Sequence, residues 1–355
     1  MPQLSGPTGC YRVVQIHPLL RCNLRCLHCY SSSGPENARS LPSEPLLAAL
    51  DLLAREGFNG VGLSGGEPLL YSELFALLQR ARERGMITTV TSNAMLITKE
   101  RAGLLREHAD VVAVSLDGPP EAHNRMRNHP RAFELMALGV DHLREAGVRF
   151  GFIFTLTYHN LHELSWIAEY AAEKGAALLQ VHPLEEVGRG AAQTGGLSPD
   201  GLELGRSFVE VARLQNKYRD RLVIQYDVAD IDILRAQPER GFAVQMDAPV
   251  PNEEGMLPPL ADLIAPIVIE ADGAIVPLQY NFSRRFELGN ILSPTLESDL
   301  NTWKTQSFPE FLAVCRRAHK KLVDSDATTL PFVNWYGAVL NESRVSGDAL
   351  TPVAV

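Results

Sequence analysis

The sequence predicts an α/β protein, a partial (β/α)6 TIM-like barrel followed by a smaller α+β C-terminal extension. Three observations support this prediction. Six short apolar runs alternate with amphipathic segments up to about residue 185, the runs are rich in β-branched residues, and the alternation stops near residue 201. Alternating strands and helices are typical of parallel sheets. A doubly wound sheet is the structural alternative, and both folds place active sites at the carboxyl ends of their strands.

The predicted strands and helices can be assigned in order along this first part of the chain. The six predicted strands are buried apolar runs at residues 13–18, 60–65, 87–92, 111–116, 150–157 and 177–184. Between them, apolar residues recur at helical spacing and a glycine follows at the expected stop, in segments 43–57, 72–85, 131–147 and 161–175. These strand and helix pairs together predict the barrel.

A different organisation is predicted after residue 195. The expected elements are a helix at 202–218, a strand at 222–227, a proline-rich loop at 247–260, a hairpin at 267–278 and a helix at 309–323. Asp272 and Gly273 are a strong hairpin turn signal. We therefore expect a barrel core at 1–195, a connecting region at 196–260, an extension at 261–325 and a tail at 326–355.

Composition and charge narrow the class of protein. The 355 residues carry a net charge of −9, which disfavours a nucleic-acid partner because phosphate backbones repel an acidic surface. No apolar run reaches the roughly 18 residues of a membrane helix, and the first residues lack a signal-peptide pattern. We expect a cytoplasmic protein that has no membrane partner. Its five cysteines are then ligands or buried thiols, because disulfides are rare in that compartment.

Cys22, Cys26 and Cys29 have the spacing C-x3-C-x2-C directly after the first predicted strand. Three thiolates this close can bind one metal centre. Structural zinc takes four protein ligands, and no fourth cysteine is near, while His28 is poorly placed to serve. A [4Fe–4S] cluster usually takes four cysteines, so three would leave one iron open to an external ligand. Zinc and simple buried thiols are the alternatives to such a cluster.

The segment CNLRCLHCY, which contains these cysteines, resembles the radical S-adenosylmethionine (radical SAM) superfamily, particularly its peptide-modifying and cofactor-modifying branches. The resemblance implies one [4Fe–4S] cluster on the three catalytic cysteines, with S-adenosylmethionine bound to the open iron. One electron from the cluster would break the sulfur–C5′ bond, and the 5′-deoxyadenosyl radical would abstract hydrogen from the substrate. The cofactors would carry the difficult chemistry, with electrons from a donor such as a flavodoxin or ferredoxin.

Gly65, Gly66 and Glu67 follow the second predicted strand in the segment GGEP. Read as residues alone, the segment is either a simple turn or a site where glycines let a ligand approach the backbone. The carboxylate of Glu67 can accept hydrogen bonds from an ammonium group. Its similarity to the family's GGEP motif implies that these three residues hold the amino group of the methionyl part of S-adenosylmethionine.

Polar residues also end the third and fifth predicted strands. Ser92 and Asn93 follow the third strand, and Thr155, Thr157 and Asn160 follow the fifth. Each group is either a cap for the next helix or, by the family resemblance, a contact for the ribose. Thr155 is the residue of the fifth strand that we assign to cofactor binding.

Ser115 and Asp117 lie in the segment SLDGP at the end of the fourth predicted strand, which resembles a family motif. The downstream segment HNRMRN contains Arg125 and Arg127. The resemblance implies that Ser115 and Arg127 bind the methionyl carboxylate, a task suited to the planar guanidinium. Arg125 is the competing choice, a surface arginine is a further alternative, and Asp117 is expected to face the substrate or brace the loop.

Two histidines lie in predicted strands, His17 in the first and His182 in the sixth. A histidine of a barrel strand is more often a buried, hydrogen-bonded residue than a catalytic one. We therefore interpret both as structural histidines.

The segment at 269–292 resembles the SPASM extension of peptide-modifying family members, in which cysteines hold auxiliary clusters. Leu278 stands where that frame has a cysteine, and Cys10 and Cys315 are too few for a four-thiolate cluster. We expect a SPASM-like extension without auxiliary clusters, with Cys315 buried in a helix. Such an extension would be a lid or a docking surface, and an exposed hairpin near Tyr280 could accept a peptide by strand addition.

Three functions remain open after these observations. The first is a radical SAM enzyme that modifies a peptide, as in maturation of ribosomally made peptides. The second is a radical SAM enzyme that acts on a small metabolite such as a nucleoside, sugar or cofactor precursor. The third is a non-catalytic scaffold of this fold that binds a partner, which the intact cysteines disfavour.

Overall fold

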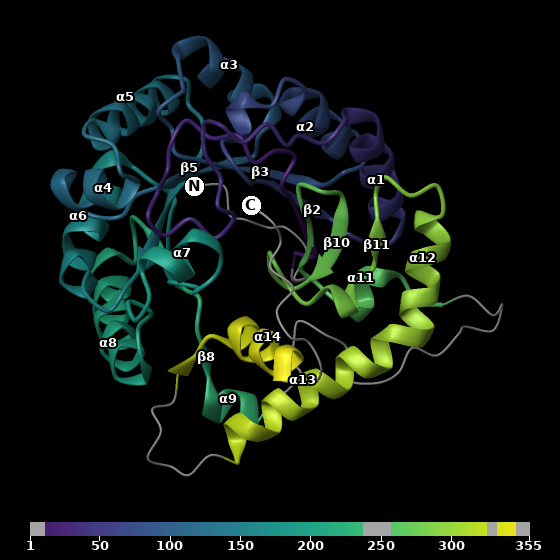
Figure 1. Cartoon of the computed structure of the whole chain (residues 1–355). Coiled ribbons are helices and arrows are strands. Elements are labelled where there is room, and N and C mark those ends of the chain that lie inside the picture. The colour runs from purple at the N-terminus through teal and green to yellow at the C-terminus, as the bar shows by residue number, and fades with distance from the viewer. Residues whose placement is uncertain (1–10, 237–256, 325–331, 346–355) are drawn as a thin grey trace.

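A sheet of ten strands forms the centre of the computed structural model, which describes residues 11–236, 257–324 and 332–345. The strand order is β11-β10-β9-β1-β2-β3-β4-β5-β6-β7. Strands β1 to β7 pair in parallel with their neighbours and curve around the middle of the molecule (Figure 1). Their bounds are β1 Val13–Ile16, β2 Gly60–Leu63, β3 Ile87–Ser92, β4 Val111–Ser115, β5 Phe150–Leu156, β6 Leu178–Pro183 and β7 Val223–Tyr226.

Helices cover the outer face of these strands (Figure 1). In α1, Leu46, Leu50 and Leu53 are buried at helical spacing, so one side of this helix packs on the sheet. Gly175 ends α6 in the left-handed conformation, with φ of 74°, as its place in the sequence predicts. The helices of the barrel are α1 Ser43–Arg55, α2 Leu74–Glu83, α3 Lys99–His108, α4 Pro120–Arg127, α5 Ala132–Glu145, α6 Leu164–Lys174, α7 Gly188–Gln193 and α8 Gly201–Tyr218.

The inner face of the strands is partly polar. Val14 and Ile16 of β1 are buried, whereas Gln15 lies between them and lines a central cavity. Thr89 and Gln180 line the same cavity from β3 and β6. Because side chains alternate along a strand, the outward set packs under the helices and the inward set is free to contact a ligand.

The mixed α/β architecture with a parallel sheet is confirmed, and the sheet extends beyond the six strands of the predicted barrel. Strand β7 lies within the predicted strand 222–227 and pairs in parallel with β6, where Val181 pairs with Tyr226. Asp200 caps α8 by accepting a hydrogen bond from the Glu203 backbone amide at 2.9 Å. This helix therefore leads the chain back to the sheet for a seventh parallel strand.

The C-terminal extension adds three strands to the opposite edge of the sheet. Strand β9 (Ile267–Ile269) runs parallel to β1, and the turn at Asp272 and Gly273 joins it to the antiparallel β10 (Ala274–Pro277). Strand β11 (Gly289–Asn290) pairs with the far side of β10. Every residue of β10 is buried and both its edges are paired, so the expectation that this hairpin is exposed for strand addition is wrong.

Helices of the extension lie across the side that the strands leave open (Figure 1). Cys315 is buried in α13, as predicted. Residues 332–345, within the expected tail, form β12 and α14. Cys10 and most of the proline-rich stretch, 247–256, lie outside the described residues. The remaining elements are β8 Ala229–Asp230, α9 Ile231–Ala236, α11 Leu260–Leu263, α12 Leu296–Thr302, α13 Phe308–Val323, β12 Phe332–Val333 and α14 Trp335–Val345.

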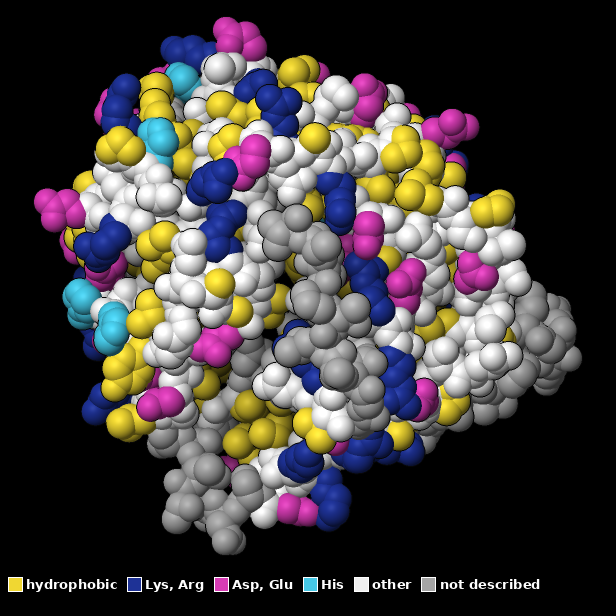
Figure 2. Space-filling model, viewed as in Figure 1, with side chains coloured by type: hydrophobic (Ala, Val, Ile, Leu, Met, Phe, Trp, Pro, Cys, Tyr) yellow, Lys and Arg dark blue, Asp and Glu magenta, His cyan; other side chains and the backbone are white. Residues whose placement is uncertain are grey.

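The surface carries charges of both signs, interspersed over the face shown in Figure 2. In the described parts of the chain, no helix is both long and apolar enough to cross a membrane.

Candidate functional site

A cavity of about 450 Å³ lies at the carboxyl ends of the barrel strands. This volume is typical of a pocket for a small molecule. The cavity is lined by the cysteine loop, by polar residues from β2 to β7 and by a few residues of the C-terminal extension. The cavity therefore contains the strand ends where the sequence predicts a site. It also contains residues of the C-terminal extension, where no cofactor-binding residue is predicted.

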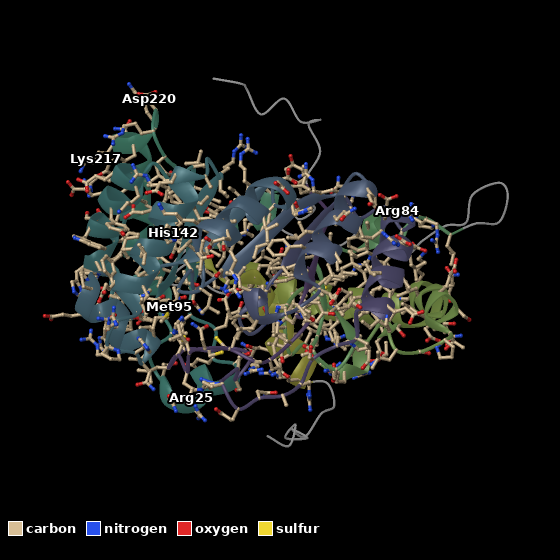
Figure 3. The ribbon with its side chains drawn as sticks, turned by 90° about the horizontal axis from the view of Figure 1, so that it is seen from above. Arg25, Arg84, Met95, His142, Lys217 and Asp220 are labelled. Atoms are coloured by element: carbon tan, nitrogen blue, oxygen red, sulfur yellow. The ribbon has the colours of Figure 1, made fainter. Side chains whose placement is uncertain are left out.

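The cysteine loop has little regular secondary structure, and contacts from other elements hold it in place. The Cys22 backbone amide donates to the Gly34 carbonyl at 3.1 Å, and Arg189 of α7 donates to the Cys26 carbonyl at 3.2 Å. The partly buried Met95 packs against the cluster of Cys22, Leu24 and Cys26. Figure 3 shows Met95 and the exposed Arg25 at the same end of the molecule. Sequence reasoning missed Arg189, which lies in a short helix with no recognisable pattern.

The three thiols line one cavity, but each contacts a different partner. Burial, together with the nearby Glu67, Cys26 and Cys29, raises the pKa of Cys22 to about 12. Cys26 Sγ lies 3.7 Å from Arg127 Nη1, and Cys29 Sγ lies 3.5 Å from Ser31 Oγ. Among the described residues, no three His, Cys, Asp or Glu side chains form a ready-made metal site. Three thiols facing one cavity are nevertheless the donor type that an iron–sulfur centre requires.

Gly65 and Gly66 let the cysteine loop pack directly on the turn after β2. Gly65 has φ of +101°, a conformation that favours glycine. The Gly66 amide donates to the Leu19 carbonyl and the Glu67 amide to the Arg21 carbonyl, both at 2.9 Å. In this structure, it is therefore the backbone of the cysteine loop that closely approaches Gly65 and Gly66.

Replacing Gly66 with alanine is expected to destabilise the protein. A Cβ at this position would lie 2.1 Å from the Arg21 carbonyl oxygen, so the cysteine loop would have to move. We expect the free energy of unfolding, measured by urea denaturation, to fall by about 1–3 kcal/mol, the usual cost of overpacking. The matched control is Gly103→Ala in α3, where an added Cβ meets nothing within 4 Å. Equal stability of the two variants would contradict the packing described for Gly66.

Glu67, Ser92 and Asn93 form one hydrogen-bonded group at the ends of β2 and β3. Glu67 is only 1% exposed, and its carboxylate accepts from Ser92 Oγ at 2.8 Å and the Asn93 amide at 3.0 Å. Burial raises the pKa of Glu67, while these hydrogen bonds lower it. The Asn93 side chain also donates to Asn23 in the cysteine loop at 2.8 Å. The structure thus brings together three of the predicted site residues.

Asp117 braces the loop and does not line the cavity. Its Oδ2 lies 2.5 Å from Arg127 Nε, and both side chains are buried. His28 lies 3.7 Å and His123 3.9 Å from the same carboxylate. Burial alone would raise the pKa of Asp117, but Arg127 and the two histidines lower it. Asp117 therefore holds Arg127, whose side chain lines the cavity.

The remaining predicted residues divide into two groups. Ser115 and Thr155 line the cavity. Asn160 instead caps the chain after β5, because it accepts from the Thr157 amide at 2.7 Å and donates to the Thr155 carbonyl. Arg125 is exposed, so of the two candidate arginines only Arg127 lines the cavity.

Sequence reasoning missed the contacts between the C-terminal extension and the site. His17 stacks on Tyr280 with ring centroids 4.8 Å apart, and Tyr30 of the cysteine loop packs beside both rings. Gln279 and Tyr336 also line the cavity. The polar end of the predicted strand 222–227 was a signal for one further residue, Asp227, which lines the cavity beside His182 and Glu185.

Comparison with known proteins finds a family match within the N-terminal part of the chain. Residues 16–171 match the family model described as the Radical SAM superfamily, so this part of the chain is a radical SAM domain. Members of this family use a [4Fe–4S] cluster and S-adenosylmethionine.

Two curated relatives and one solved structure illustrate the similarity. Fe-coproporphyrin III synthase of Methanosarcina barkeri is 34% identical over 173 residues, which are 48% of this chain and 43% of that protein. Mycofactocin maturase MftC of Mycolicibacterium smegmatis is 32% identical over 181 residues, 50% of this chain and 46% of that protein. The chain thus spans about half the length of these relatives. Streptococcus suis SuiB bound to precursor peptide SuiA shares the fold, with TM-score 0.63, 17% identity and coverage of 92% of this chain and 70% of that chain.

Proposed function

We propose, from the premise that residues 16–171 form a radical SAM domain, that this protein is a radical SAM enzyme with a single [4Fe–4S] cluster on Cys22, Cys26 and Cys29. The observation that carries the proposal is that these three thiols line one cavity together with Glu67 and Arg127. When bound, the cluster supplies the electron that cleaves S-adenosylmethionine to a 5′-deoxyadenosyl radical, which abstracts hydrogen from the substrate. A non-catalytic scaffold would have no need of this donor set.

The residues around the thiols suit the two charged ends of the methionyl group. Gly65, Gly66 and Glu67 are proposed to hold the ammonium group, since Glu67 is a buried acceptor beside the cysteine loop. Ser115 and Arg127 are proposed to hold the carboxylate. Asp117 forms an ion pair with the Nε side of Arg127 and Cys26 Sγ accepts from Nη1, while no described residue accepts from Nη2. That nitrogen is therefore available to a carboxylate.

Ser92, Asn93 and Thr155 are proposed to lie near the ribose, since all three line the cavity at the ends of β3 and β5. Asp117 is proposed to contribute indirectly, by fixing the orientation of Arg127. We retain residues 261–325 as a SPASM-like extension without an auxiliary cluster. Its Leu278, Gln279 and Tyr280 line the cavity, which supports a lid or a substrate-contacting wall.

The substrate that we propose is a peptide, modified as in maturation of ribosomally made peptides. The shared fold with SuiB, whose structure contains a precursor peptide, supports this choice. A small molecule such as a cofactor precursor is the second candidate, because a relative of 34% identity is named Fe-coproporphyrin III synthase. We propose a cytoplasmic enzyme that has reduced thiols, takes electrons from a flavodoxin or ferredoxin, and uses neither nucleic acid nor a membrane as partner.

Anaerobic reconstitution tests this function. The full chain is loaded with iron and sulfide, reduced with dithionite and mixed with S-adenosylmethionine, and 5′-deoxyadenosine is measured by chromatography. We expect its release to depend on both iron and reductant. A chain that binds iron yet releases none would contradict the proposed function.

A further inference from the structure

The ends of β6 and β7 carry a cluster of charged side chains to which the proposed reaction gives no role. His182 Nδ1 lies 3.1 Å from Asp227 Oδ2, and His182 Nε2 lies 3.4 Å from Glu185 Oε1. Gln180 Nε2 donates to Asp227 Oδ2 at 2.5 Å, and Gln225 Nε2 donates to Oδ1 at 2.9 Å. His182, Glu185 and Asp227 line the central cavity, and we call these three residues the β6–β7 wall.

The β6–β7 wall presents hydrogen-bond acceptors to the cavity. Burial alone would lower the pKa of His182, but hydrogen bonds and charge from Asp227 and Glu185 raise it to about 10. The imidazole is therefore protonated at neutral pH, with Nδ1 hydrogen-bonded to Asp227 and Nε2 in an ion pair with Glu185. One positive and two negative charges leave the wall with a net charge of −1. Glu185 Oε2 has no hydrogen-bond partner among the described residues.

A second acceptor faces the same cavity from the C-terminal extension. Gln279 lines the cavity and is only 7% exposed, yet its Oε1 has no hydrogen-bond partner within the described parts of the chain. A buried amide oxygen is almost always hydrogen-bonded, so an unpaired one beside a cavity indicates that a ligand supplies the donor. Gln279 and the β6–β7 wall are therefore both suited to a ligand that donates hydrogen bonds.

These acceptors are separate from those proposed for the methionyl group. Glu67 follows β2, whereas His182 is on β6 and Asp227 follows β7. Strands β3, β4 and β5 lie between the two places in the sheet. One cavity thus has two acceptor groups, and a single ammonium group of S-adenosylmethionine can occupy only one of them.

We propose that the β6–β7 wall and Gln279 form a substrate subsite for a hydrogen-bond-donating cation, the primary ammonium or guanidinium of a lysine or arginine side chain. This inference rests on the proposed function and assigns the substrate class of the same site. A cation with several N–H donors has more than one hydrogen bond to give, and the Glu185 and Gln279 oxygens that lack partners line the same cavity. A substrate rich in carboxylates meets like charge at this wall and is disfavoured.

Binding of matched peptide probes tests the subsite. The reconstituted full chain with S-adenosylmethionine is titrated calorimetrically with acetyl-Gly-Gly-Lys-Gly-Gly-amide and with versions containing acetyl-lysine or glutamate. We expect the lysine peptide to bind about 10- to 100-fold more tightly than the other two, as for hydrogen bonds between charged groups. Free cadaverine distinguishes a small amine from a peptide, since binding of cadaverine that depends on the wall shows that the cation alone is sufficient.

Three variants locate the binding of the lysine peptide. Glu185→Gln and Asp227→Asn are each expected to weaken it at least about tenfold. The matched control is Glu186→Gln, which changes an exposed neighbouring carboxylate and is expected to leave it unchanged. Thermal unfolding checks that Asp227→Asn folds, and the partly exposed Glu185 provides a second variant if it does not.

Equal binding of the lysine and acetyl-lysine peptides, or tighter binding of the glutamate peptide, would overturn the inference. Wild-type affinity in both wall variants would do the same. Release of 5′-deoxyadenosine without any peptide is measured in parallel. If 5′-deoxyadenosine is released but the peptides do not bind as expected, the subsite is wrong and the proposed radical chemistry is retained. If release fails, the proposed function is wrong whatever the probes do.

Discussion

Cys26→Ala is expected to abolish iron binding and cleavage of S-adenosylmethionine together. Cys26 is the middle residue of the C-x3-C-x2-C loop and is buried beside Arg127, so no other thiol of the described chain can take its place. Mutating a residue that hydrogen-bonds to a metal ligand already lowers metal affinity or activity about 10- to 100-fold. Losing a ligand itself should therefore leave less than about 1% of the wild-type 5′-deoxyadenosine. Iron content by colorimetric assay and nucleoside release by chromatography measure both effects.

The control for this experiment is another buried cysteine. Cys315 is fully buried in α13 and does not line the cavity, so Cys315→Ala should retain iron and cleavage. Its expected defect is limited to a lower unfolding temperature, because the substitution removes packed atoms from the core. Wild-type iron content in Cys26→Ala, or its loss in Cys315→Ala, would show that the cluster site has been assigned to the wrong thiols.

Asp117→Ala is expected to lower the free energy of unfolding by about 3–5 kcal/mol, the usual cost of leaving one member of a buried ion pair alone. Asp117 and Arg127 are both buried and their charged groups lie 2.5 Å apart. Without the carboxylate, the buried Arg127 guanidinium keeps its charge but loses its partner, since arginine does not deprotonate in proteins. Urea denaturation of the apoprotein measures the change without interference from a bound cluster.

An exposed ion pair of the same kind provides the comparison. Arg131 and Glu134 lie on the surface 2.6 Å apart, with side chains 61% and 65% exposed. Glu134→Ala should therefore cost much less than Asp117→Ala, because water screens the charges of an exposed pair. Similar losses in Asp117→Ala and Glu134→Ala would mean that the Asp117–Arg127 pair does not carry the stabilising role described here.

The parallel sheet and the cysteine loop could be predicted because their signals are local in the sequence. The strand from 111 to 116 is a continuous apolar run, and the three cysteines and GGEP each lie within a few residues. Glu67, Ser92 and Asn93 could each be placed at the end of a predicted strand, and the carboxyl ends of parallel strands lie at one edge of the sheet. Their hydrogen bonds to one another follow from that placement.

The rest of the site depends on pairings between distant segments. The strand at 222–227 is predicted, but no local signal shows that it pairs with β6. Asp227 reaches the cavity only because of that pairing. Tyr336 lies in a stretch that reads as a tail, although α14 brings it to the cavity. The role of Asp117 was left open, because sequence spacing does not tell whether a carboxylate faces a cavity or turns to a buried arginine.

The pairing of β1 with β9 has a consequence during synthesis on the ribosome. Val14 and Ile16 pair with Ile267 and Ile269, which are translated about 250 residues later. At about 5–20 residues per second, the first strand waits roughly 12 to 50 s for this neighbour. Throughout that interval the strand that leads into the cysteine loop has an unpaired apolar edge, which is open to pairing with other nascent chains. Aggregation of unfinished chains is therefore a hazard until residue 269 has emerged.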